Sequence, residues 1–480
     1  MKAVIRALPV ISPTSMLLAM LIVSLVVTFG TAYFGITFAL LVLLLILGVP
    51  FLLGIILYPK FGVIVLLIVS YLIMWVTRFG LTGDFPLGTL MDGFYVLLII
   101  GLLATQKIER NWDIFKNPIT YMIGIWIGYN ILEVANPVAE SRLAWLYSIR
   151  STAIVMVTYF VFLKHIRSVK FLRLIFKLWI GLTLFAALYA IKQEFFGFFA
   201  FEEKDIQSAQ ARNLLFIGGH WRKWSIFSDP VAFSYNMVVS AILCIVLIMN
   251  EIKFYKKLIL GFLAFLFMAT MLYSGTRGAN VLLPASIFML AVMKFNYRIL
   301  TFSLIGVAFL VVLIFIPTSN QNIVRFQSAF KPSDDPSFNL RKANQKRIQP
   351  YIQTHPFGGG LGSTEVWGTK FAPNSYLAHF PPDSGYVRVA VELGYVGLFL
   401  LCTFMFTIFK TGIRNYYAIK DPELKNYCLA MVLIVFALNI GNYPQESLIQ
   451  FPLSVYFYLC IAIMQVTRRL DDEKQQLSLT

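Results

Sequence analysis

Residues 381–406 have the sequence PPDSGYVRVAVELGYVGLFLLCTFMF, in which a polar segment passes into an apolar helix. The polar segment as a whole, residues 318–384, contains arginines, histidines and a glycine-rich turn. The apolar part that follows is long enough to cross a bilayer, which takes about 20 residues of helix. A chain that is apolar elsewhere has little reason to leave the membrane for so long without a function. We therefore interpret the rest of the chain as a scaffold for this junction.

The composition indicates a membrane protein. Hydrophobic residues make up 59% of the 480 residues and charged residues 13%, whereas soluble domains have about 25% charged residues. We expect the first apolar run to open a helical array rather than to act as a cleaved signal peptide. The four cysteines lie singly in or beside apolar runs, which predicts small buried hydrophobic residues rather than metal ligands or disulfides.

Apolar runs of membrane-spanning length follow one another along the chain. They predict an all-α polytopic membrane protein with about 14 transmembrane helices, in which residues 1–480 form a single membrane domain. The runs are 16–33, 36–57, 61–79, 88–105, 118–135, 146–165, 171–192, 230–250, 256–274, 277–295, 298–317, 386–410, 425–442 and 449–467.

Lysine and arginine gather in alternate loops between these runs. This distribution is typical of loops on the cytoplasmic side, and it explains most of the formal net charge of +17 without a nucleic-acid partner. It predicts that both termini are cytoplasmic. The two longest polar loops, 193–229 and 318–385, then lie on the outer face.

The larger of these loops is expected to be partly helical. Apolar spacing over 337–349 predicts a helix that stops near Pro350. The sequence HPFGGGLG at 355–362 must turn sharply or approach another backbone closely, since glycine allows both.

Arg277 lies in YSGTRGANVLL, residues 273–283, at the outer junction of two runs. Ser274 or Thr276 can cap a helix that begins there. A free helix N-terminus and a guanidinium would then form an anion site suited to phosphate. The alternative is an arginine that merely extends to the lipid headgroups.

Arg222 lies in HWRKWSIFSDPVAFSYN, residues 220–236, which enters the apolar run 230–250 from the outer side. Taken alone, this segment also fits an aromatic belt followed by a helix start at 228–230. Arg150 lies inside the sixth apolar run, where an ionisable residue is a candidate for function.

Asp383 lies at the mouth of the twelfth run. Its ordinary role would be a helix N-cap, and its functional role would be a general base that activates a hydroxyl. Arg388 and Glu392 follow at about one-turn intervals, and charges so close to a bilayer usually pair or bind substrate. We predict that the substrate-binding side chains are Arg388, Arg347, Arg341, Arg150, Tyr386 and His379.

We expect neither a metal nor another cofactor. The four histidines are scattered, with no pair at i and i+4. Nothing in the sequence resembles a phosphate-binding P-loop or a dinucleotide fingerprint.

Three segments resemble motifs of the O-antigen ligases and O-antigen polymerase-like membrane glycosyltransferases. YSGTRGANVLL resembles an S/T-x-S-R-G helix start. WRKWSIFSDPVAFSYN resembles R-x-x-G-x-F-x-D/N-P-N, with Ser225 where glycine is common and Val231 where asparagine is common. DSGYVRVAVELGYVG resembles the ligases' H-[NSQ]-x9-G-x-x-G, with Asp383 in place of the histidine.

The resemblance implies a fold and an activity. Members of this family resemble enzymes of the GT-C type. They transfer a glycan from undecaprenyl diphosphate to an acceptor sugar hydroxyl, without metal or nucleotide, at the outer face of the bacterial inner membrane. The resemblance also implies that Arg222 and Arg277 hold the pyrophosphate and that Asp383 is the base. The implied partners are the lipid-linked glycan donor, a glycan or lipid-core acceptor such as that of lipopolysaccharide, and membrane lipids.

Other functions stay open at this point. A transporter or flippase of a glycolipid or another solute would also suit about 14 spans, although such proteins usually have repeated halves and midplane binding residues. The histidine-to-aspartate change keeps an inactive assembly or sensor protein in consideration. The sequence does not distinguish a ligase from a polysaccharide polymerase.

Overall fold

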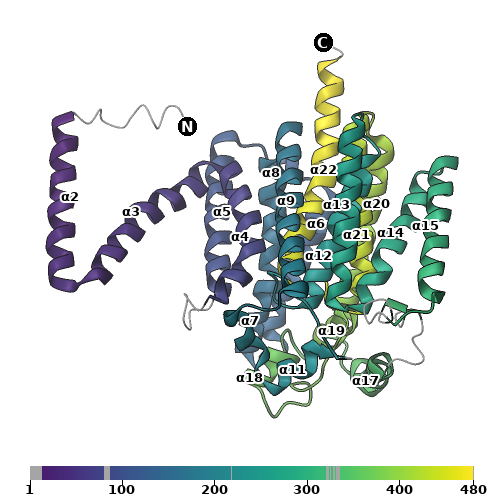
Figure 1. Ribbon diagram of the computed structural model, residues 1–480. Helices are drawn as coiled ribbons and strands as arrows, with labels where there is room; N and C mark the ends of the chain where they lie inside the picture. Colours follow the sequence, from purple (N-terminus) through teal and green to yellow (C-terminus); the bar gives the residue numbers. More distant parts are fainter. Residues whose placement is uncertain are drawn as a thin grey trace.

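The computed structural model describes residues 13–79, 87–217, 219–319 and 336–478, together with 324, 326, 327 and 330. Within these residues the only strands form one short antiparallel hairpin, β1 (Phe216–Ile217) and β2 (His220–Trp221). The long helices stand side by side in a bundle, and short helices and loops gather at one end of it (Figure 1). We call this end, which carries α10, α11, α17 and α18, the loop end. The predicted all-α polytopic membrane fold is confirmed.

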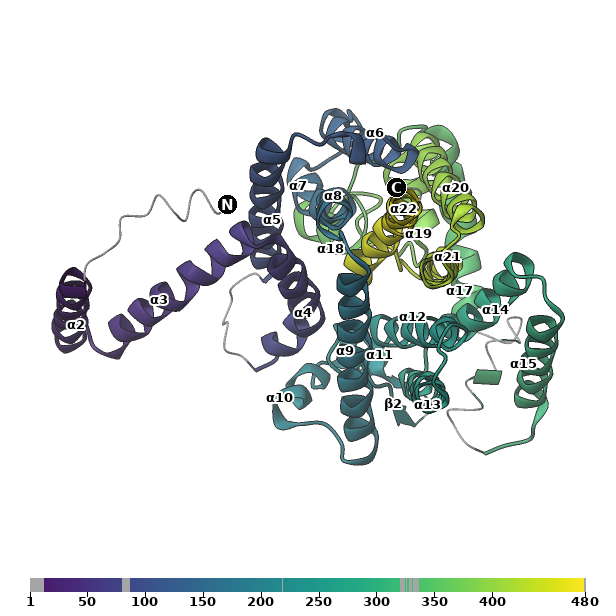
Figure 2. The same ribbon diagram turned by 90° about the horizontal axis from the view of Figure 1, so that it is seen from above.

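The first helices lie at one side of the bundle, and α2 and α3 extend away from it (Figures 1 and 2). Only 6% of the most apolar stretch of α3 is buried, so this helix exposes nearly its whole surface, as expected for a helix in lipid. Proline at the first position starts α4, where its missing N–H is not needed. These helices are α2 (Pro13–Phe34), α3 (Ile36–Leu57), α4 (Pro59–Thr77) and α5 (Leu87–Glu109).

The next helices begin at short polar caps. Asn117 accepts a hydrogen bond from Thr120 N at 3.0 Å, and Ser141 and Ser168 cap their helices in the same way. The predicted run 146–165 is interrupted by a 3-10 turn after Ala153. The elements are η1 (Asp113–Phe115), α6 (Pro118–Leu132), η2 (Glu133–Ala135), α7 (Arg142–Thr152), η3 (Ile154–Met156), α8 (Val157–His165) and α9 (Val169–Phe195).

The helix start predicted at 228–230 is confirmed. Asp229 caps α12 through hydrogen bonds from Val231 N and Ala232 N, and Pro230 is the first helical residue. This part of the chain comprises α10 (Ala200–Glu203), η4 (Lys204–Ile206), α11 (Ala209–Leu215), α12 (Pro230–Ile248), α13 (Phe254–Met271), η5 (Leu272–Ser274), η6 (Arg277–Val281), α14 (Leu282–Met293) and α15 (Tyr297–Phe315).

Two boundaries in the C-terminal part differ from the prediction. The helix of the large loop continues through Pro350 to Thr354 instead of stopping there. The run 386–410 is broken at Leu393, because Gly394 has φ 66 and a Cβ there would lie 2.0 Å from Pro356 O. The elements are α17 (Pro336–Thr354), α18 (Glu365–Phe371), α19 (Gly385–Glu392), α20 (Gly394–Ala418), α21 (Pro422–Gly441) and α22 (Leu453–Leu477).

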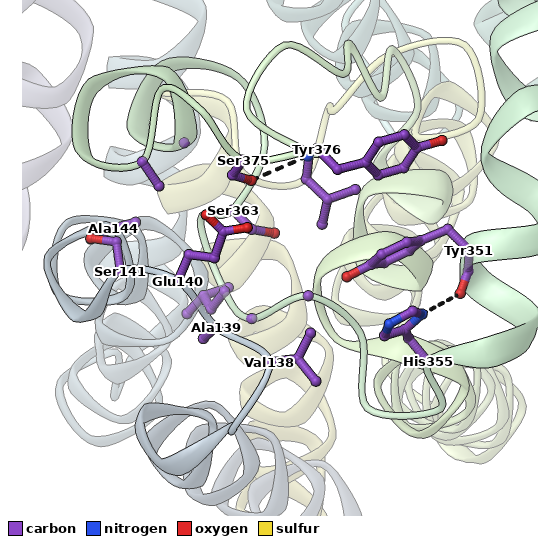
Figure 3. A pocket seen from close by; sticks show the side chains of 16 residues that line it. Val138, Ala139, Glu140, Ser141, Ala144, Tyr351, His355, Ser363, Ser375 and Tyr376 are labelled. Carbon is purple, nitrogen blue, oxygen red and sulfur yellow. Dashed lines mark hydrogen bonds between the residues drawn. The ribbon is translucent and has the colours of Figure 1, made fainter.

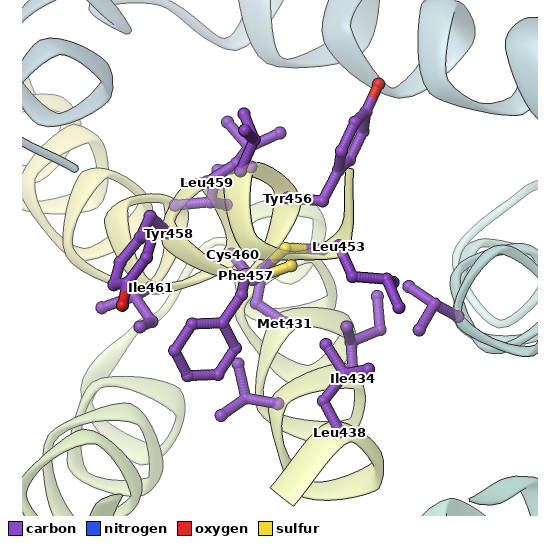
Figure 4. Close-up of a cluster of buried hydrophobic side chains, with 14 of the residues drawn as sticks. Met431, Ile434, Leu438, Leu453, Tyr456, Phe457, Tyr458, Leu459, Cys460 and Ile461 are labelled. Atoms are coloured by element: carbon purple, nitrogen blue, oxygen red, sulfur yellow. The ribbon is translucent and has the colours of Figure 1, made fainter. Parts of the chain in front are cut away.

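The core lies where α12, α21 and α22 pack together. In α12 and α21, 78% of the most apolar stretch is buried. Figure 2 shows α22 near the centre of the bundle, between α8 and α21. Met431, Ile434 and Leu438 of α21 interlock with Leu453, Phe457 and Cys460 of α22 (Figure 4). Three of the cysteines are buried as predicted, whereas Cys402 is exposed.

All the predicted apolar runs coincide with helices, but not all are long. Nine helices among the described residues are long and apolar enough to cross a membrane. Three more apolar helices there are shorter, Leu21–Phe34, Arg277–Met293 and Leu304–Phe315. The described part of the chain is therefore that of a multi-pass membrane protein, in which nine of the predicted runs form helices of full spanning length and others form shorter or interrupted helices.

Candidate functional site

Two arginines from separate parts of the chain, Arg222 and Arg277, lie close together at the loop end. Arg222 follows the β1–β2 hairpin, and its Nε donates to Ser274 O at 2.8 Å. Its Nη2 donates to Thr276 Oγ1 at 3.1 Å, directly beside Arg277. The backbone is joined at the same place, since Lys223 N donates to Tyr273 O at 3.0 Å. We call residues 221–223 and 273–277 the arginine corner.

The corner is built differently from the predicted capped helix. Thr276 occupies the N-cap position, but its hydroxyl makes no capping bond. That hydroxyl instead donates to Pro230 O and accepts from Arg222. The helix that starts at Arg277 is a 3-10 segment. Thr276 therefore orients Arg222 rather than capping the helix.

A short path of close contacts leads from the corner to Asp383. A Cβ on Gly278 would lie 3.1 Å from the hydroxyl of Tyr235, and that hydroxyl donates to Gly441 O at 3.1 Å. The next residue, Asn442, accepts a hydrogen bond from Gly385 N at 2.9 Å. The segment containing Arg277 and the start of α19 thus pack on the same end of α21.

Asp383 does not cap α19. Ser384 occupies the N-cap position, and Ser384 N donates to Pro382 O at 2.6 Å, so the chain turns tightly at Asp383. Asp383 has φ 51, a left-handed conformation that costs most residues energy but that aspartate, asparagine and histidine adopt more readily. Within the described part of the chain its carboxylate accepts no hydrogen bond. Strained, unbonded groups of this kind often belong to functional sites.

Arg341 supplies a cation beside Asp383. Helix α17 rests on α19 through a buried cluster that contains Ile348, Phe380 and Val391. This packing brings the Arg341 guanidinium within electrostatic range of Asp383 and of Tyr235. Burial raises the pKa of Asp383 above its usual value, and the charge of Arg341 opposes that rise.

Arg388 is held by carboxylates. Its Nη1 donates to Glu446 at 2.6 Å, and its Nε lies 3.3 Å from Glu392. Burial favours the neutral guanidine, but the surrounding carboxylates outweigh it and keep the pKa of Arg388 above its usual value. Glu392 is 1% exposed and also accepts hydrogen bonds from Gly362 N at 3.0 Å and from Thr364. We call Arg388, Glu392, Glu446 and the neighbouring Glu365 the carboxylate cluster.

Glu365 is the residue that sequence reasoning missed. It begins α18 with φ 52, and none of the described residues bonds to its carboxylate. Burial, together with the charges of Glu446, Glu392 and Asp383, raises its pKa to about 7 against the opposing charge of Arg388. Its sequence neighbourhood, GSTEVWG, gives no signal for this, because the neighbouring charges come from distant parts of the chain.

The glycine-rich turn makes the close approaches that the sequence predicts. Gly358, Gly360 and Gly362 all have φ between 74 and 93. A Cβ on Gly358 would lie 2.4 Å from the carbonyl carbon of Glu392, and one on Gly362 would lie 2.3 Å from Ser148 Oγ. The turn therefore threads between α7 and the α19–α20 junction, where only glycine fits.

The remaining predicted residues have other contacts. Arg150 pairs with Asp92 of α5 at 2.6 Å. His379 is exposed and lies 3.1 Å from Pro373 O, and Arg347 is exposed near the ring of Phe380. The hydroxyl of Tyr386 bonds to Asn439 of α21 at 2.6 Å. The structure thus gathers Arg222, Arg277, Arg341, Asp383 and Arg388 near one end of α21. Tyr386 contacts that same end, whereas Arg150, Arg347 and His379 are engaged elsewhere.

The arrangement combines cations with an unbonded carboxylate. No group of three or more histidine, cysteine or acidic side chains within the described ranges is arranged to hold a metal ion. Buried Ser384 Oγ, next to Asp383, has no hydrogen-bond partner in the described part, so a polar group of a ligand could be satisfied there. Such a site can accept a proton at one point and stabilise an anion at another.

Residues 260–402 match the family model described as O-antigen ligase. The matched segment begins in α13 and ends in α20, and it contains Arg277, Arg341, Asp383 and Arg388, whereas Arg222 precedes it. The match agrees with the family predicted from the three motifs, and it supports glycan transfer at a membrane between a lipid-linked glycan and an acceptor. No curated protein matches the chain.

Proposed function

We propose that the chain, whose residues 260–402 match the O-antigen ligase family model, transfers a glycan from undecaprenyl diphosphate to a sugar hydroxyl of an acceptor. The observation that carries this proposal is the convergence of the arginine corner, Arg341 and Asp383 on one end of α21. Asp383 occupies the position where the family's ligases carry a histidine, and the arginine corner occupies the positions of the family's arginines.

In the proposed reaction the acceptor oxygen attacks the anomeric carbon of the donor. The bond from that carbon to the diphosphate oxygen breaks, and undecaprenyl diphosphate leaves with the bonding electrons. Asp383 takes the proton from the acceptor hydroxyl. A general base works best when its pKa lies near the working pH, and burial moves the pKa of Asp383 upward in that direction.

The arginines stabilise the leaving group. Arg222 is fixed by hydrogen bonds to Ser274 O and Thr276 Oγ1, so its guanidinium is positioned before the substrate arrives. Cations that are already in place where negative charge develops give the largest electrostatic gain. We assign the diphosphate to Arg222, Arg277 and Arg341, with no metal ion in the reaction.

The proposed orientation of the bundle in the membrane follows from the distribution of lysine and arginine between its two ends. The end of the bundle opposite the loop end carries lysine- and arginine-rich connections, such as 164–173 and 410–425 (Figure 1). Such connections favour the cytoplasmic side. We therefore propose that the loop end faces the periplasm at the bacterial inner membrane, and that 193–229 and 318–385 are its outer loops.

The test is transfer by purified protein in proteoliposomes. Arg222→Ala and Arg277→Ala should each abolish product while the protein still inserts and keeps its thermal stability. Arg173→Ala is the matched control, since Arg173 pairs with Glu423 at the opposite end of the bundle and should leave transfer unchanged. Full activity of both corner variants would refute the mechanism, and lipid-linked glycan crossing the bilayer without transfer would favour a flippase.

The acceptor class is addressed by a deletion strain. If single repeat units accumulate, the protein is a polymerase. If long chains remain on the carrier lipid, it is a ligase. An unchanged glycan profile with a full set of products would contradict both assignments.

A further inference from the structure

The loop end contains a second concave site, on the far side of the glycine-rich turn from the carboxylate cluster. It is a pocket of about 160 Å³, which is large enough for several water molecules but too small for a folded segment of protein. Its walls come from the connection before α7, the C-terminal end of α17 and the segment before Asp383 (Figure 3). Nothing in the proposed transfer chemistry uses these residues.

One wall of the pocket is aromatic. Tyr351, in the last turn of α17, and His355, which directly follows that helix, stack with ring centroids 4.0 Å apart and planes at 8°. Tyr376 stacks on Tyr351 with centroids 5.7 Å apart, and the Tyr376 residue is 64% exposed. The face of an aromatic ring carries partial negative charge, which attracts the weakly positive C–H groups on one side of a sugar ring.

Hydrogen-bonding groups lie on both sides of the pocket (Figure 3). The carboxylate of Glu140 and the hydroxyl of Tyr351 both point into the pocket (Figure 3). Buried Ser363 Oγ has no hydrogen-bond partner among the described residues. None of the described residues pairs with Glu140, although Tyr351 lies close enough to feel its charge. These groups could accept and donate hydrogen bonds to sugar hydroxyls.

The charge of the lining selects against anions. No lysine or arginine is among the side chains that line the pocket, and Glu140 is negative. A phosphate or a sugar acid would be repelled, whereas an uncharged ring with several hydroxyls fits both walls. The floor of the pocket requires glycine at position 359, because a Cβ there would lie 2.8 Å from Tyr351 Oη and 3.3 Å from Ser363 Oγ.

The pocket is rigidly linked to α19. Gly359 N donates to Val391 O and Gly360 N to Glu392 O, each at 2.9 Å. The turn that forms the pocket floor therefore also fixes the helix that follows Asp383. Because the glycine-rich turn contacts both the pocket and α19, it fixes the position of a ligand in the pocket relative to the proposed base, Asp383.

The faces of Tyr351 are covered by His355 and Tyr376, so its hydroxyl is the part that a ligand can reach. We propose that this pocket binds one uncharged pyranose ring of the acceptor glycan, stacked on Tyr376 and hydrogen-bonded to Tyr351, Glu140 and Ser363. The acceptor role rests on the proposed function, whereas the binding of a sugar ring does not. The affinity of a single ring is expected in the millimolar range, because so small a contact gains little beyond the cost of ordering.

The experiment measures binding without catalysis. Full-length protein in detergent is mixed with neutral methyl hexopyranosides, and saturation-transfer NMR records which ring protons touch the protein. We expect saturation of one ring face in at least one glycoside. Tyr376→Ala, Glu140→Gln and Gly359→Ala should each weaken this binding at least tenfold. Trp367→Phe, an aromatic change outside the pocket, should not.

The outcomes separate this site from the transfer chemistry. Asp383→Asn should keep full sugar binding even though it loses transfer. If the wild-type protein binds a glycoside but transfers nothing, the pocket stands and the proposed function fails. If no neutral glycoside binds, if a sugar acid binds more tightly than a neutral ring, or if the folded pocket variants bind as well as the wild type, the proposal is overturned.

Discussion

Asp383 lies just before the short helix α19 and Glu392 is its last residue, and the two carboxylates have opposite surroundings. Glu392 is buried, accepts hydrogen bonds from Gly362 and Thr364, and pairs with Arg388. Asp383 is half-buried, adopts a left-handed conformation and, among the described residues, accepts no hydrogen bond. A carboxylate whose lone pairs are all used fixes the structure, whereas one whose lone pairs are unused can take up a proton.

Glu365 belongs with Asp383 in this comparison. It too has a positive φ and lacks a hydrogen-bond partner in the described part of the chain. Glu392 thus holds the glycine-rich turn beside α19, whereas Asp383 and Glu365 keep their oxygens unbonded. Three substitutions test this division, in order of decreasing effect, and a fourth, with the smallest effect, tests another residue with positive φ.

Asp383→Asn should reduce transfer about 10²- to 10⁴-fold, the usual contribution of a general base. Asparagine has the same shape and accepts the left-handed conformation, so the thermal midpoint should not change. Transfer kinetics in proteoliposomes and thermal unfolding in detergent measure the two quantities. A parallel loss of stability would place Asp383 with Glu392 and break the comparison.

Glu392→Ala should destabilise the fold by about 3–5 kcal/mol, the usual cost of breaking a buried ion pair. It leaves Gly362 N and Thr364 without their acceptor and Arg388 with Glu446 alone. Thermal unfolding measures the loss. The double variant with Arg388→Ala should cost less than the sum of the two single changes. Additive losses would show that the pair does not act as a unit.

Glu365→Gln should change how stability depends on pH. The pKa of Glu365 is raised from 4.5 to about 7 in the folded state, so folding favours the protonated form. This stabilising contribution is complete below pH about 4.5 and is lost as the pH rises through 7. Glutamine imitates the protonated form, so at pH 8 the variant should be more stable by about 1–3 kcal/mol. The thermal unfolding midpoints of the variant and the wild type, measured from pH 4.5 to 8, test this prediction. Parallel curves for variant and wild type would contradict the raised pKa.

Ser225→Gly should have the smallest effect. Ser225 has φ 55, which costs a serine about 1–2 kcal/mol relative to glycine. The serine hydroxyl recovers part of this by donating to Ala186 O at 2.6 Å. The net change in the free energy of unfolding should stay within about 1 kcal/mol, and transfer should be unaffected. A large destabilisation would show that the hydroxyl matters more than the backbone conformation.

Ser225 also shows what sequence could and could not predict. The family's motif commonly has glycine there, and the left-handed backbone gives the physical reason. Local features of this kind were predictable: the apolar runs, the Asp229–Pro230 helix start and the close approaches of the glycine-rich turn. The first two depend on neighbouring residues alone, and for the turn the run of glycines predicts that a close approach occurs but not that Glu392 and Ser148 make it.

Features that depend on distant contacts were not predictable. Arg150 is engaged by Asp92, and the pKa of Glu365 depends on Glu446, far along the chain. Helix α17 passes Pro350 because it packs on α19 through Ile348 and Val391. The break of the twelfth run at Leu393 follows from the approach of Pro356 to Gly394. Hydropathy carries no information on such partners.

The most direct test of the central claim is the transfer rate of Asp383→His relative to Asp383→Asn. Histidine accepts the left-handed conformation and can act as a base, and the resemblance places a histidine at this position in the ligases. If Asp383 is the base, Asp383→His retains transfer, with a rate that rises with pH through about 6.5 as the imidazole loses its proton. Equal rates for the histidine and asparagine variants, both close to the wild-type rate, would contradict the claim.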